Sequence, residues 1–443
     1  MKINNTINTI VSNDLCTGCG MCTYQNSNYE MKWNDNGFLT PEQTSNYNLN
    51  LEKDIVKLCP FNLETNDDEN SLSNIFIKSA PQKSTKIGSY YNTYAGHSNK
   101  YRLKSSSGGV ASYITEVLLK TKEVEHVFLV AGGDTSPYEY KIISNSEDII
   151  QGATTKYYPV TMAGVINKAT ELEGKIAIVG IPCFLKSVRL AQKQNRELKD
   201  KITFLVGIFC GGLKSSFFAD YLAQSSGVAS NFTKPKFRIK NHKSTASDYS
   251  FGCQDSKGNE KTVRMKSLGD MWGTGLFKNN ACDFCDDVTA ELADISLGDA
   301  WVKPYVDDGK GTNIIITRSE LADKIINSGG DNKELSLEPL PLEQVINSQR
   351  GGIKHRQDAL PYRQGIFKSK GLVTPKKKRF VEIDSINFIE KIIQKKRLKT
   401  RENSLNYWKE YEDVEIFNTK LKKELFNLRI LTKINNYYKK IKN

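Results

Sequence analysis

The sequence predicts an α/β protein with some α+β elements, built around a central and mainly parallel sheet. Three observations predict this fold. Short apolar runs alternate with helical patterns between residues 91 and 350, four of the nine cysteines lie in the first 60 residues, and Lys and Arg accumulate near the C-terminus. We therefore divide the 443 residues into a small cysteine-bearing segment (1–60), a polar linker (61–90), a core (91–350) and a basic helical extension (351–443).

The first segment carries three cysteines at a spacing typical of iron–sulfur proteins. Cys16, Cys19 and Cys22 form the pattern C-x2-C-x2-C, in a loop that also contains Gly18 and Gly20. Glycines allow such a short loop to bring three thiolates to one face of a cluster, because glycine adopts backbone conformations that other residues avoid. A cubane cluster requires a fourth thiolate.

The candidate for the fourth thiolate is Cys59, which is followed by Pro60, like the Cys-Pro pair that ends bacterial ferredoxin motifs. We therefore expect a ferredoxin-like segment with one 4Fe-4S cluster, held by Cys16, Cys19, Cys22 and Cys59. A tetrahedral zinc site also takes four cysteines and is the alternative. Zinc sites more often combine two C-x2-C pairs, so the spacing favours the iron–sulfur cluster.

Strands and helices alternate through the core. Strands are predicted for four short apolar runs, at residues 124–131 (VEHVFLVA), 175–180 (KIAIVG), 202–207 (ITFLVG) and 312–317 (TNIIIT). Helical patterns accompany these runs at residues 110–122, 184–194, 215–224 and 319–327. Strands that alternate with helices of this length indicate a parallel, doubly wound sheet.

Four more cysteines suggest a second metal centre. Cys183 and Cys210 each come just after one of two consecutive predicted strands. Ligands gather at the carboxyl ends of parallel strands, and neighbouring strands lie about 5 Å apart, so these two thiols would share one crevice. Cys282 and Cys285 form a C-x2-C pair that completes a set of four. We expect a second cluster here. The alternatives are buried thiols for the first two and a zinc or redox site for the pair, with Cys253 left as a free thiol.

Charge and hydropathy limit the remaining classes of function. No run approaches the roughly 18 apolar residues of a membrane span, and the first residues lack the apolar core of a signal peptide, so we expect a cytoplasmic protein with reduced thiols. The net charge is +13, and residues 373–443 hold 19 Lys or Arg against 9 Asp or Glu. The extension is expected to present a solvated helical face, with peripheral contact to an anionic membrane or an acidic partner as the alternative. Nucleic acid is not expected, because the core lacks interleaved aromatic and basic residues.

Six motifs of the chain resemble those of one protein family. They are residues 102–110 (RLKSSSGGV), 155–157 (TKY), 180–183 (GIPC), 237–240 (FRIK), 282–285 (CDFC) and 293–301 (ADISLGDAW). In this order and spacing, the chain resembles the beta subunit of coenzyme F420-reducing hydrogenase and dehydrogenase, fused to a ferredoxin-like segment. The resemblance extends over roughly residues 10–350.

The resemblance implies an iron–sulfur flavoprotein. Members of this family bind FAD beside a cubane cluster and pass electrons between iron–sulfur centres and a hydride carrier, of which coenzyme F420 is the best known. The Ser/Gly run at residues 105–109 opens a predicted helix, and free N–H groups there suit a pyrophosphate; on the residues alone, a plain helix cap is the simpler interpretation. The expected FAD-binding residues are Ser105, Ser106, Ser107, Gly108, Gly109, Lys156, Arg238 and Lys240.

The chain departs from the family pattern in three places. Phe184 replaces a glutamine after Cys183, residues 153–155 (ATT) replace a Gly-Ser pair, and the basic extension has no counterpart. We predict an oxidoreductase that exchanges electrons with a redox partner protein, such as a ferredoxin or a dehydrogenase or hydrogenase subunit, and with a small-molecule hydride acceptor. The alternatives are a ferredoxin-dependent reductase of a biosynthetic intermediate, for example of a surface polysaccharide, and a non-catalytic electron-transfer subunit. No catalytic residue is assigned.

Overall fold

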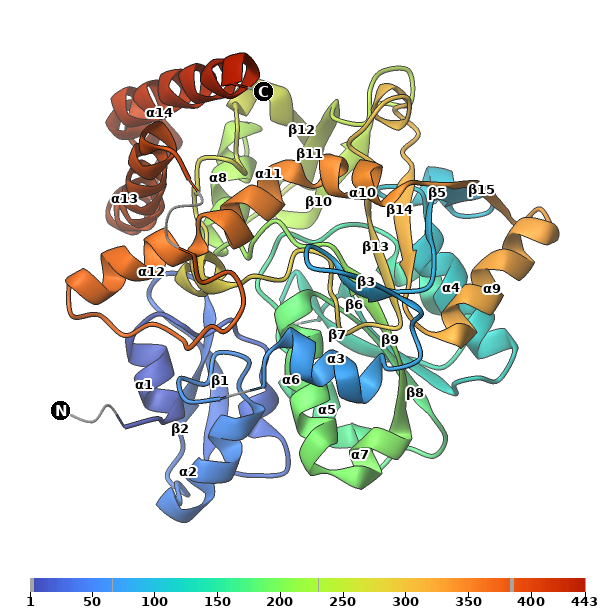
Figure 1. Cartoon of the computed structure of the whole chain (residues 1–443). Helices are drawn as coiled ribbons and strands as arrows, with labels where there is room; N and C mark the ends of the chain where they lie inside the picture. The colour runs from blue at the N-terminus through green and yellow to red at the C-terminus, as the bar shows by residue number, and fades with distance from the viewer. Residues whose placement is uncertain (1–3, 66, 135, 230, 383–385, 443) are drawn as a thin grey trace.

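The computed structural model describes residues 4–442 except 66, 135, 230 and 383–385, and in these residues it contains one large sheet and three small ones (Figure 1). The large sheet has eight strands in the order β15-β5-β14-β13-β9-β8-β6-β7. Their bounds are β5 (Thr93–Ser98), β6 (His126–Gly132), β7 (Tyr138–Ile143), β8 (Ile176–Gly180), β9 (Ile202–Ile208), β13 (Ile295–Asp299), β14 (Asn313–Thr317) and β15 (Leu335–Pro339).

The centre of this sheet is parallel and its flanks are antiparallel. Strands β13, β9, β8 and β6 pair in parallel, whereas β7, β14, β5 and β15 pair antiparallel to their neighbours. The predicted mainly parallel sheet is therefore confirmed for its centre, which includes the neighbouring strands β8 and β9. Strand β14 belongs to a flank because it follows β13 through the loop 300–312, without the crossover helix that a parallel return requires.

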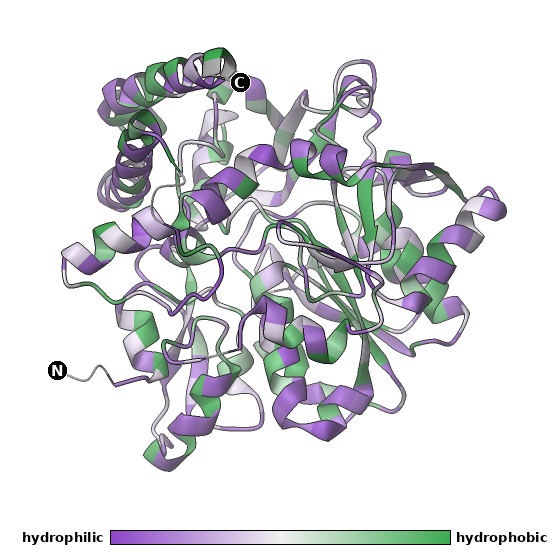
Figure 2. Ribbon diagram, viewed as in Figure 1, coloured by the Kyte–Doolittle hydropathy of each residue, from purple (hydrophilic) through white to green (hydrophobic). Residues whose placement is uncertain are grey.

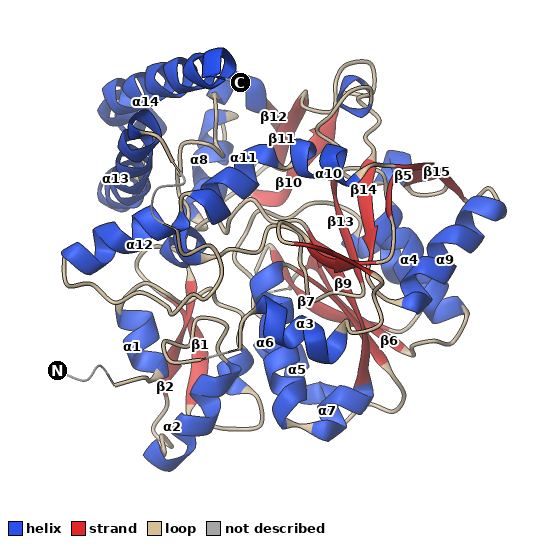
Figure 3. Ribbon diagram, in the orientation of Figure 1, coloured by secondary structure: helices blue, strands red, loops and turns tan. Residues whose placement is uncertain are grey.

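Helices cover both faces of the sheet (Figure 3). Helices α4 (Val110–Lys120) and α9 (Glu320–Asp331) cover one face, and α5 (Ala163–Ile166), α6 (Pro182–Gln194) and α7 (Arg196–Lys201) cover the other. Successive side chains of a strand point to opposite faces. Within β9, Val206 accordingly packs toward α4 and Leu205 toward α6. The sheet strands are mainly apolar, as their buried position requires (Figure 2).

The N-terminal segment packs against the core as a small unit of its own. It contains α1 (Ile7–Ser12), the two-stranded sheet of β1 (Tyr29–Trp33) and β2 (Leu39–Gln43), and α2 (Leu49–Ile55). Its core includes Ile10 and Tyr29, and the same cluster contains Phe284 of the C-x2-C region. The segment is therefore joined to the core by apolar packing.

Residues 61–90, predicted as a linker, are folded. They contain α3 (Glu69–Phe76) and the hairpin of β3 (Gln82–Ser84) and β4 (Gly88–Tyr90). Leu72 and Ile87 are fully buried, and Glu69 forms a buried ion pair with Lys186 of α6 at 3.0 Å. The polar composition was misleading here, because the polar residues are used in caps and ion pairs of a packed segment.

The remaining elements form a second layer beside the sheet. Helix α8 (Phe217–Ser225) packs with the sheet of β10 (Thr233–Lys240), β11 (Tyr249–Gln254) and β12 (Glu260–Arg264). The chain continues through α10 (Leu342–Ser348), α11 (Arg350–Ile353) and α12 (Leu360–Ser369), and ends in the helical hairpin of α13 (Phe388–Tyr411) and α14 (Val414–Lys442). The hairpin lies at the periphery of the molecule (Figure 1).

The predicted helical extension is thus confirmed as helical, but it does not only present a solvated face. Leu405, Trp408, Phe417 and Leu421 of the hairpin are buried in one cluster with Phe277 of the core. The charge count missed this, because apolar residues that are few in number can all lie on one side of a helix. Among the described residues, no helix is long and apolar enough to span a membrane.

Candidate functional site

The first thiol set, defined as Cys16, Cys19, Cys22 and Cys59, gathers where the N-terminal segment meets the core. Burial raises the pKa of the Cys22 thiol, and the other three thiols raise it further. Burial raises the pKa of Cys16 to about 12, with a contribution from Cys19. Charges affect one another in this way only over short distances, so all four sequence-predicted ligands lie together.

Hydrogen bonds from the core fix the loop that carries three of these thiols. The backbone N–H of Met162 donates to the Cys19 carbonyl at 3.0 Å, and the Asn279 amide donates to the Cys16 carbonyl at 2.9 Å. Gly20 has φ 82°, and a Cβ there would lie 2.2 Å from the Thr161 hydroxyl. Only glycine fits this close approach at positive φ.

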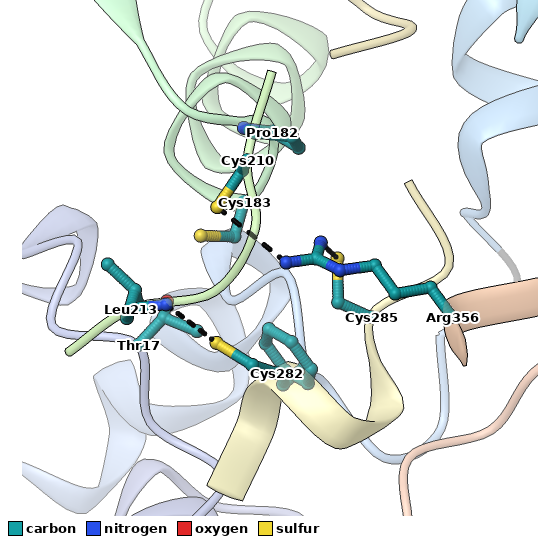
Figure 4. A pocket seen from close by; sticks show the side chains of 9 residues that line it. Thr17, Pro182, Cys183, Cys210, Leu213, Cys282, Cys285 and Arg356 are labelled. Atoms are coloured by element: carbon teal, nitrogen blue, oxygen red, sulfur yellow. Dashed lines mark hydrogen bonds between the residues drawn. The ribbon is translucent and has the colours of Figure 1, made fainter. Parts of the chain in front are cut away.

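The second thiol set, defined as Cys183, Cys210, Cys282 and Cys285, lines one small pocket (Figure 4). Cys183 lies in the first turn of α6, directly after β8, and Cys210 follows β9. Because β8 and β9 pair, the two thiols share one crevice, as the sequence predicts. The Cys282 thiol accepts from the Leu213 N–H at 3.2 Å, an interaction that also stabilises a thiolate.

The Arg356 guanidinium reaches into the second thiol set, close to Cys210 and Cys285 (Figure 4). Its guanidinium donates to Cys285 Sγ at 3.2 Å, to Cys210 Sγ at 3.7 Å and to the Asp287 carbonyl at 2.9 Å. The side chain is buried. Burial by itself lowers the pKa of Arg356, but the charges of Cys285, Cys210 and Cys282 raise it above its usual range. The guanidinium is therefore placed to stabilise negative charge on these sulfur atoms.

The two thiol sets are neighbours. The pKa of Cys183 is raised by burial, by the other members of its own set, and also by Cys19 of the first set. Cys183 and Cys19 both raise the pKa of the Tyr140 hydroxyl. One packed apolar cluster also contains members of both sets, namely Cys22, Cys59, Cys183 and Cys285. The arrangement places eight thiols in two adjoining groups of four.

The donor chemistry of each group fits a cubane cluster. A 4Fe-4S cluster takes four cysteine thiolates, one at each iron, and each group offers four. Among the residues that the structure describes, no three Cys, His, Asp or Glu side chains are arranged to hold a single metal ion. Cys253 is remote from both groups: it is buried in β11 and its thiol contacts the Ser226 hydroxyl at 3.7 Å.

The Ser/Gly run at residues 105–109 leads into α4, as predicted. Several of its polar groups are used within the protein: the Ser106 hydroxyl accepts from the Thr155 N–H at 2.9 Å, and the Ser107 hydroxyl donates to the Thr312 carbonyl at 3.2 Å. A Cβ on Gly108 would lie 2.7 Å from the Gly96 carbonyl, so this glycine serves strand packing. Gly109, with φ 80°, caps α4. The buried hydroxyl of Ser105 has no hydrogen-bond partner, so it is the hydroxyl of this run that remains available to a ligand.

The three predicted basic residues surround this run. The Lys240 ammonium donates to the Ser107 carbonyl at 3.1 Å, and burial lowers its pKa to about 8. Arg238 forms a buried ion pair with Asp299 at 2.6 Å and lies between the rings of Tyr249 and Trp301. The two terminal nitrogens of Arg238 are therefore engaged by the protein itself, while its buried Nε has no hydrogen-bond partner.

Lys156 differs from the other two because its ammonium has a single hydrogen-bond partner, the Gly152 carbonyl at 2.7 Å, whereas the Lys240 ammonium donates to three carbonyls. Burial lowers the pKa of Lys156 to about 7 from a usual value of 10.5. Between these two pKa values the unfolded chain binds a proton that the folded protein lacks. The free energy of unfolding therefore rises as the pH increases from 7 to 10.5. Burial of Lys156 lowers this free energy most at pH 7 and below.

Replacing Lys156 by methionine should remove this pH dependence. We expect the difference in free energy of unfolding, K156M minus wild type, to be largest at pH 7 and to shrink toward pH 10, as measured by urea unfolding. The matched control is Lys168→Met, at an exposed lysine, for which the difference should not change with pH. An equally constant difference for K156M would contradict the lowered pKa.

An aromatic pair connects the basic residues to the second thiol set. Tyr157 and Trp272 have ring centroids 4.5 Å apart. Burial raises the pKa of Tyr157, and the charges of Arg238 and Cys210 are both close enough to affect it. A Cβ on Gly211, next to Cys210, would lie 3.5 Å from the Trp272 ring. The candidate flavin residues thus adjoin the second thiol set.

Sequence reasoning missed the charged residues that surround the thiols. Arg356 lies in the segment taken as an extension, and nothing in its local sequence marks it. Asp283, next to Cys282, is surrounded by cationic or protonatable groups. Lys278 is close to it in sequence, whereas His355, Arg363 and Arg401 come from distant parts of the chain. A lone basic residue in a basic helical region gives no signal, because its partner is set by the tertiary fold.

Comparison with known proteins identifies the family. Residues 93–167 match the model described as "Coenzyme F420 hydrogenase/dehydrogenase, beta subunit N-term", and residues 173–343 match the companion model for the C terminus of the same beta subunit. A solved structure with the same fold comes from the F420-reducing [NiFe] hydrogenase complex of Methanosarcina barkeri. It has a TM-score of 0.51 and 18% identity, and the match covers 67% of this chain and 98% of that one.

Curated relatives agree with these matches. One subunit of the F(420)H(2) dehydrogenase of Methanosarcina mazei is 24% identical over 281 residues, which is 60% of this chain and 72% of that protein. The coenzyme F420-dependent sulfite reductase of Methanocaldococcus jannaschii is 23% identical over 366 residues, 78% of this chain but only 50% of that protein. The two family models together match more than half of the chain, and the chain belongs to the family of coenzyme F420 hydrogenase/dehydrogenase beta subunits.

Proposed function

We propose that this protein is an iron–sulfur flavoprotein oxidoreductase, which passes electrons through two 4Fe-4S clusters to FAD and on to a hydride acceptor such as coenzyme F420. The observation that carries the proposal is the pair of adjoining thiol sets, together with Arg356 directed at the second. Each set supplies four thiols, and the sets are close enough for Cys19 to affect the pKa of Cys183.

The electrostatics of the second set support metal ligation over free thiols. Burial raises the pKa of Cys183 and of Cys285, the latter to about 12, so free thiols here would be neutral. Arg356 would then be a buried cation without an anionic partner, which costs several kcal/mol. Metal binding keeps cysteine ligands deprotonated, and this supplies the anions that Arg356 requires.

The residues around the Ser/Gly run support a flavin beside the second set. FAD, when bound, exchanges electrons with iron–sulfur clusters and with a two-electron hydride carrier. The Ser105 hydroxyl, the Lys156 ammonium and Arg238 Nε keep free hydrogen-bonding capacity toward it. Arg238 and Lys240 hold neighbouring backbone and side chains in position. The buried Tyr157 ring packs on Trp272 and lies near both Arg238 and Cys210.

The names of the relatives support a coenzyme F420 reaction and a protein redox partner. They include part of a dehydrogenase and part of a hydrogenase complex. The sulfite reductase relative is about twice as long as its match to this chain, which favours a module that delivers electrons to a further catalytic unit. The protein would either react with coenzyme F420 itself or only deliver electrons to another catalytic unit. A steady-state assay with reduced coenzyme F420 distinguishes these two roles, because direct turnover requires the coenzyme site on this chain. The cytoplasmic location stays a prediction.

Anaerobic purification with analysis of iron, sulfide, zinc and flavin tests the proposal. We expect about eight iron atoms and one FAD per chain. Cys59→Ser and Cys282→Ser should each lower the iron content to about four, because each removes one ligand of a different cluster. The matched control is Cys253→Ser, which should keep all the iron. Zinc without iron or sulfide would sink the proposal, and an unchanged iron content in C282S would remove the second cluster.

A further inference from the structure

The outer face of α14 has a pattern that the redox proposal does not use. Five apolar side chains on this face are exposed, at spacings of three and four residues, so they form one stripe along the helix. They are Phe426 (58% exposed), Ile430 (39%), Ile434 (48%), Tyr437 (69%) and Ile441 (69%). Figure 2 shows apolar and polar residues side by side along this helix.

This stripe lies away from the face of α14 that packs on the protein. Among the described side chains of the helix, the buried ones are Phe417, Leu421, Leu428 and Asn435. Phe417 and Leu421 pack with α8 and α13, and Asn435 accepts a hydrogen bond from Asn387 at the start of α13. The exposed stripe is therefore not needed to hold the hairpin in place. An exposed apolar stripe of this length marks a surface that contacts another partner.

The charge beside the stripe indicates what this partner is. Lys422, Arg429 and Lys433 are exposed and their spacing puts them along one edge of the stripe. Residues 422–442 contain seven lysines or arginines and a single acidic residue, Glu424. Glu424 is engaged inside the hairpin, where it accepts from Thr400 at 2.5 Å and from Asn403 at 2.8 Å. The outer face is thus apolar and basic at once.

We propose that α14 docks the protein on an anionic phospholipid surface, with the stripe inserted among the headgroups and the basic edge against lipid phosphates. A helix with apolar residues on one side and lysines or arginines beside them lies in the plane of a membrane interface. The core is held above the surface by the packing of Trp408 and Phe417 against α8. The hairpin lies outside residues 93–167 and 173–343, which the family models match, so the family match itself does not imply this docking.

Vesicle co-sedimentation of the full chain tests the proposal and needs no redox turnover. The probes are vesicles of pure phosphatidylcholine and of phosphatidylcholine mixed with phosphatidylglycerol. We expect binding to the anionic vesicles only, weakened by salt as the Debye length falls from about 10 Å at 0.1 M to 3 Å at 1 M. Equal binding to both vesicles, or none to the anionic ones, would overturn the proposal.

Two triple variants separate the parts of the face. Lys422→Gln, Arg429→Gln and Lys433→Gln together should weaken binding about a hundredfold, since each basic residue near an anionic surface contributes about fivefold. Phe426→Ser, Ile430→Ser and Tyr437→Ser together should weaken it more than tenfold, because their apolar surface stays in water.

Matched controls use exposed residues elsewhere. Lys53→Gln, Lys168→Gln and Lys257→Gln change the net charge equally, and Leu49→Ser, Ile75→Ser and Leu103→Ser remove equally exposed apolar groups. Both control variants should bind as the wild type does. Circular dichroism confirms folding of each variant. Light scattering tests the other occupant: a dimer that the serine triple variant dissociates, without vesicle binding by the wild type, would show that the stripe joins two copies instead.

Discussion

Replacing Arg356 by methionine is expected to lower the reduction potential of the second cluster by about 60–130 mV. A positive charge beside a cluster stabilises its reduced form, which carries one more negative charge. A hydrogen bond to a charged group contributes about 1.5–3 kcal/mol, and for one electron a tenfold change in equilibrium, about 1.4 kcal/mol, corresponds to 59 mV. A redox titration followed by electron paramagnetic resonance measures the shift, while the potential of the first cluster should stay unchanged.

Two further variants show whether the charge is responsible. Arg356→Lys keeps the positive charge and should recover part of the potential. Arg196→Met removes an arginine that is 94% exposed and lies at 3.8 Å from its partner Asp200, so the potential should remain that of the wild type. If R356M and R196M gave equal potentials, Arg356 would have no electrostatic role at the cluster.

Replacing Trp408 by alanine is expected to lower the free energy of unfolding by about 3–5 kcal/mol, the usual cost of removing a buried tryptophan. Trp408 is 2% exposed, and its ring lies 5.7 Å from Tyr221, 5.9 Å from Phe277 and 5.4 Å from Phe417, between centroids. Urea unfolding measures the change. Because Phe277 is followed by Lys278 and Asn279, which contact Asp283 and the loop of the first thiol set, we also expect W408A to bind iron less completely.

The matched control lies on the same helix. Phe388 begins α13 and is 75% exposed, so F388A should change the free energy of unfolding by less than about 0.5 kcal/mol. Identical unfolding midpoints for W408A and the wild type would mean that the hairpin unfolds on its own before the core. In that case the basic extension would be an appendage, as its composition suggests.

The sequence was sufficient for features that depend on local pattern. Apolar runs located β6, β8, β9 and β14, and the order of β8 and β9 led to a shared crevice for Cys183 and Cys210, which the structure contains. The C-x2-C-x2-C spacing likewise led to a thiol set that the structure brings together. These predictions succeed because strand periodicity and short-range ligand spacing are both properties of neighbouring residues.

Other features depend on partners that are distant in sequence. The composition of residues 61–90 predicts a linker, but in the fold Glu69 of this segment pairs with Lys186, which is 117 positions away in sequence. The role of Arg356 becomes visible only where Cys210 and Cys285, which come from separate loops, converge on its guanidinium. Trp408 in a basic helix has no visible partner until Phe277 and Tyr221 are placed against it. Sequence alone does not show such pairs, because their energy comes from tertiary burial and not from local propensity.

The clamped loop of the first thiol set has a consequence for how electrons can arrive. With Cys19 bound to Met162, Cys16 bound to Asn279 and Gly20 wedged against Thr161, the N-terminal segment cannot act as a swinging arm that collects electrons at one place and discharges them at another. In the proposed electron transfer, the donor protein must instead bind at a fixed site on the surface, where Cys16 and Cys59 are partly exposed. Collision frequency with that donor, and not tether length, would then set the rate of supply.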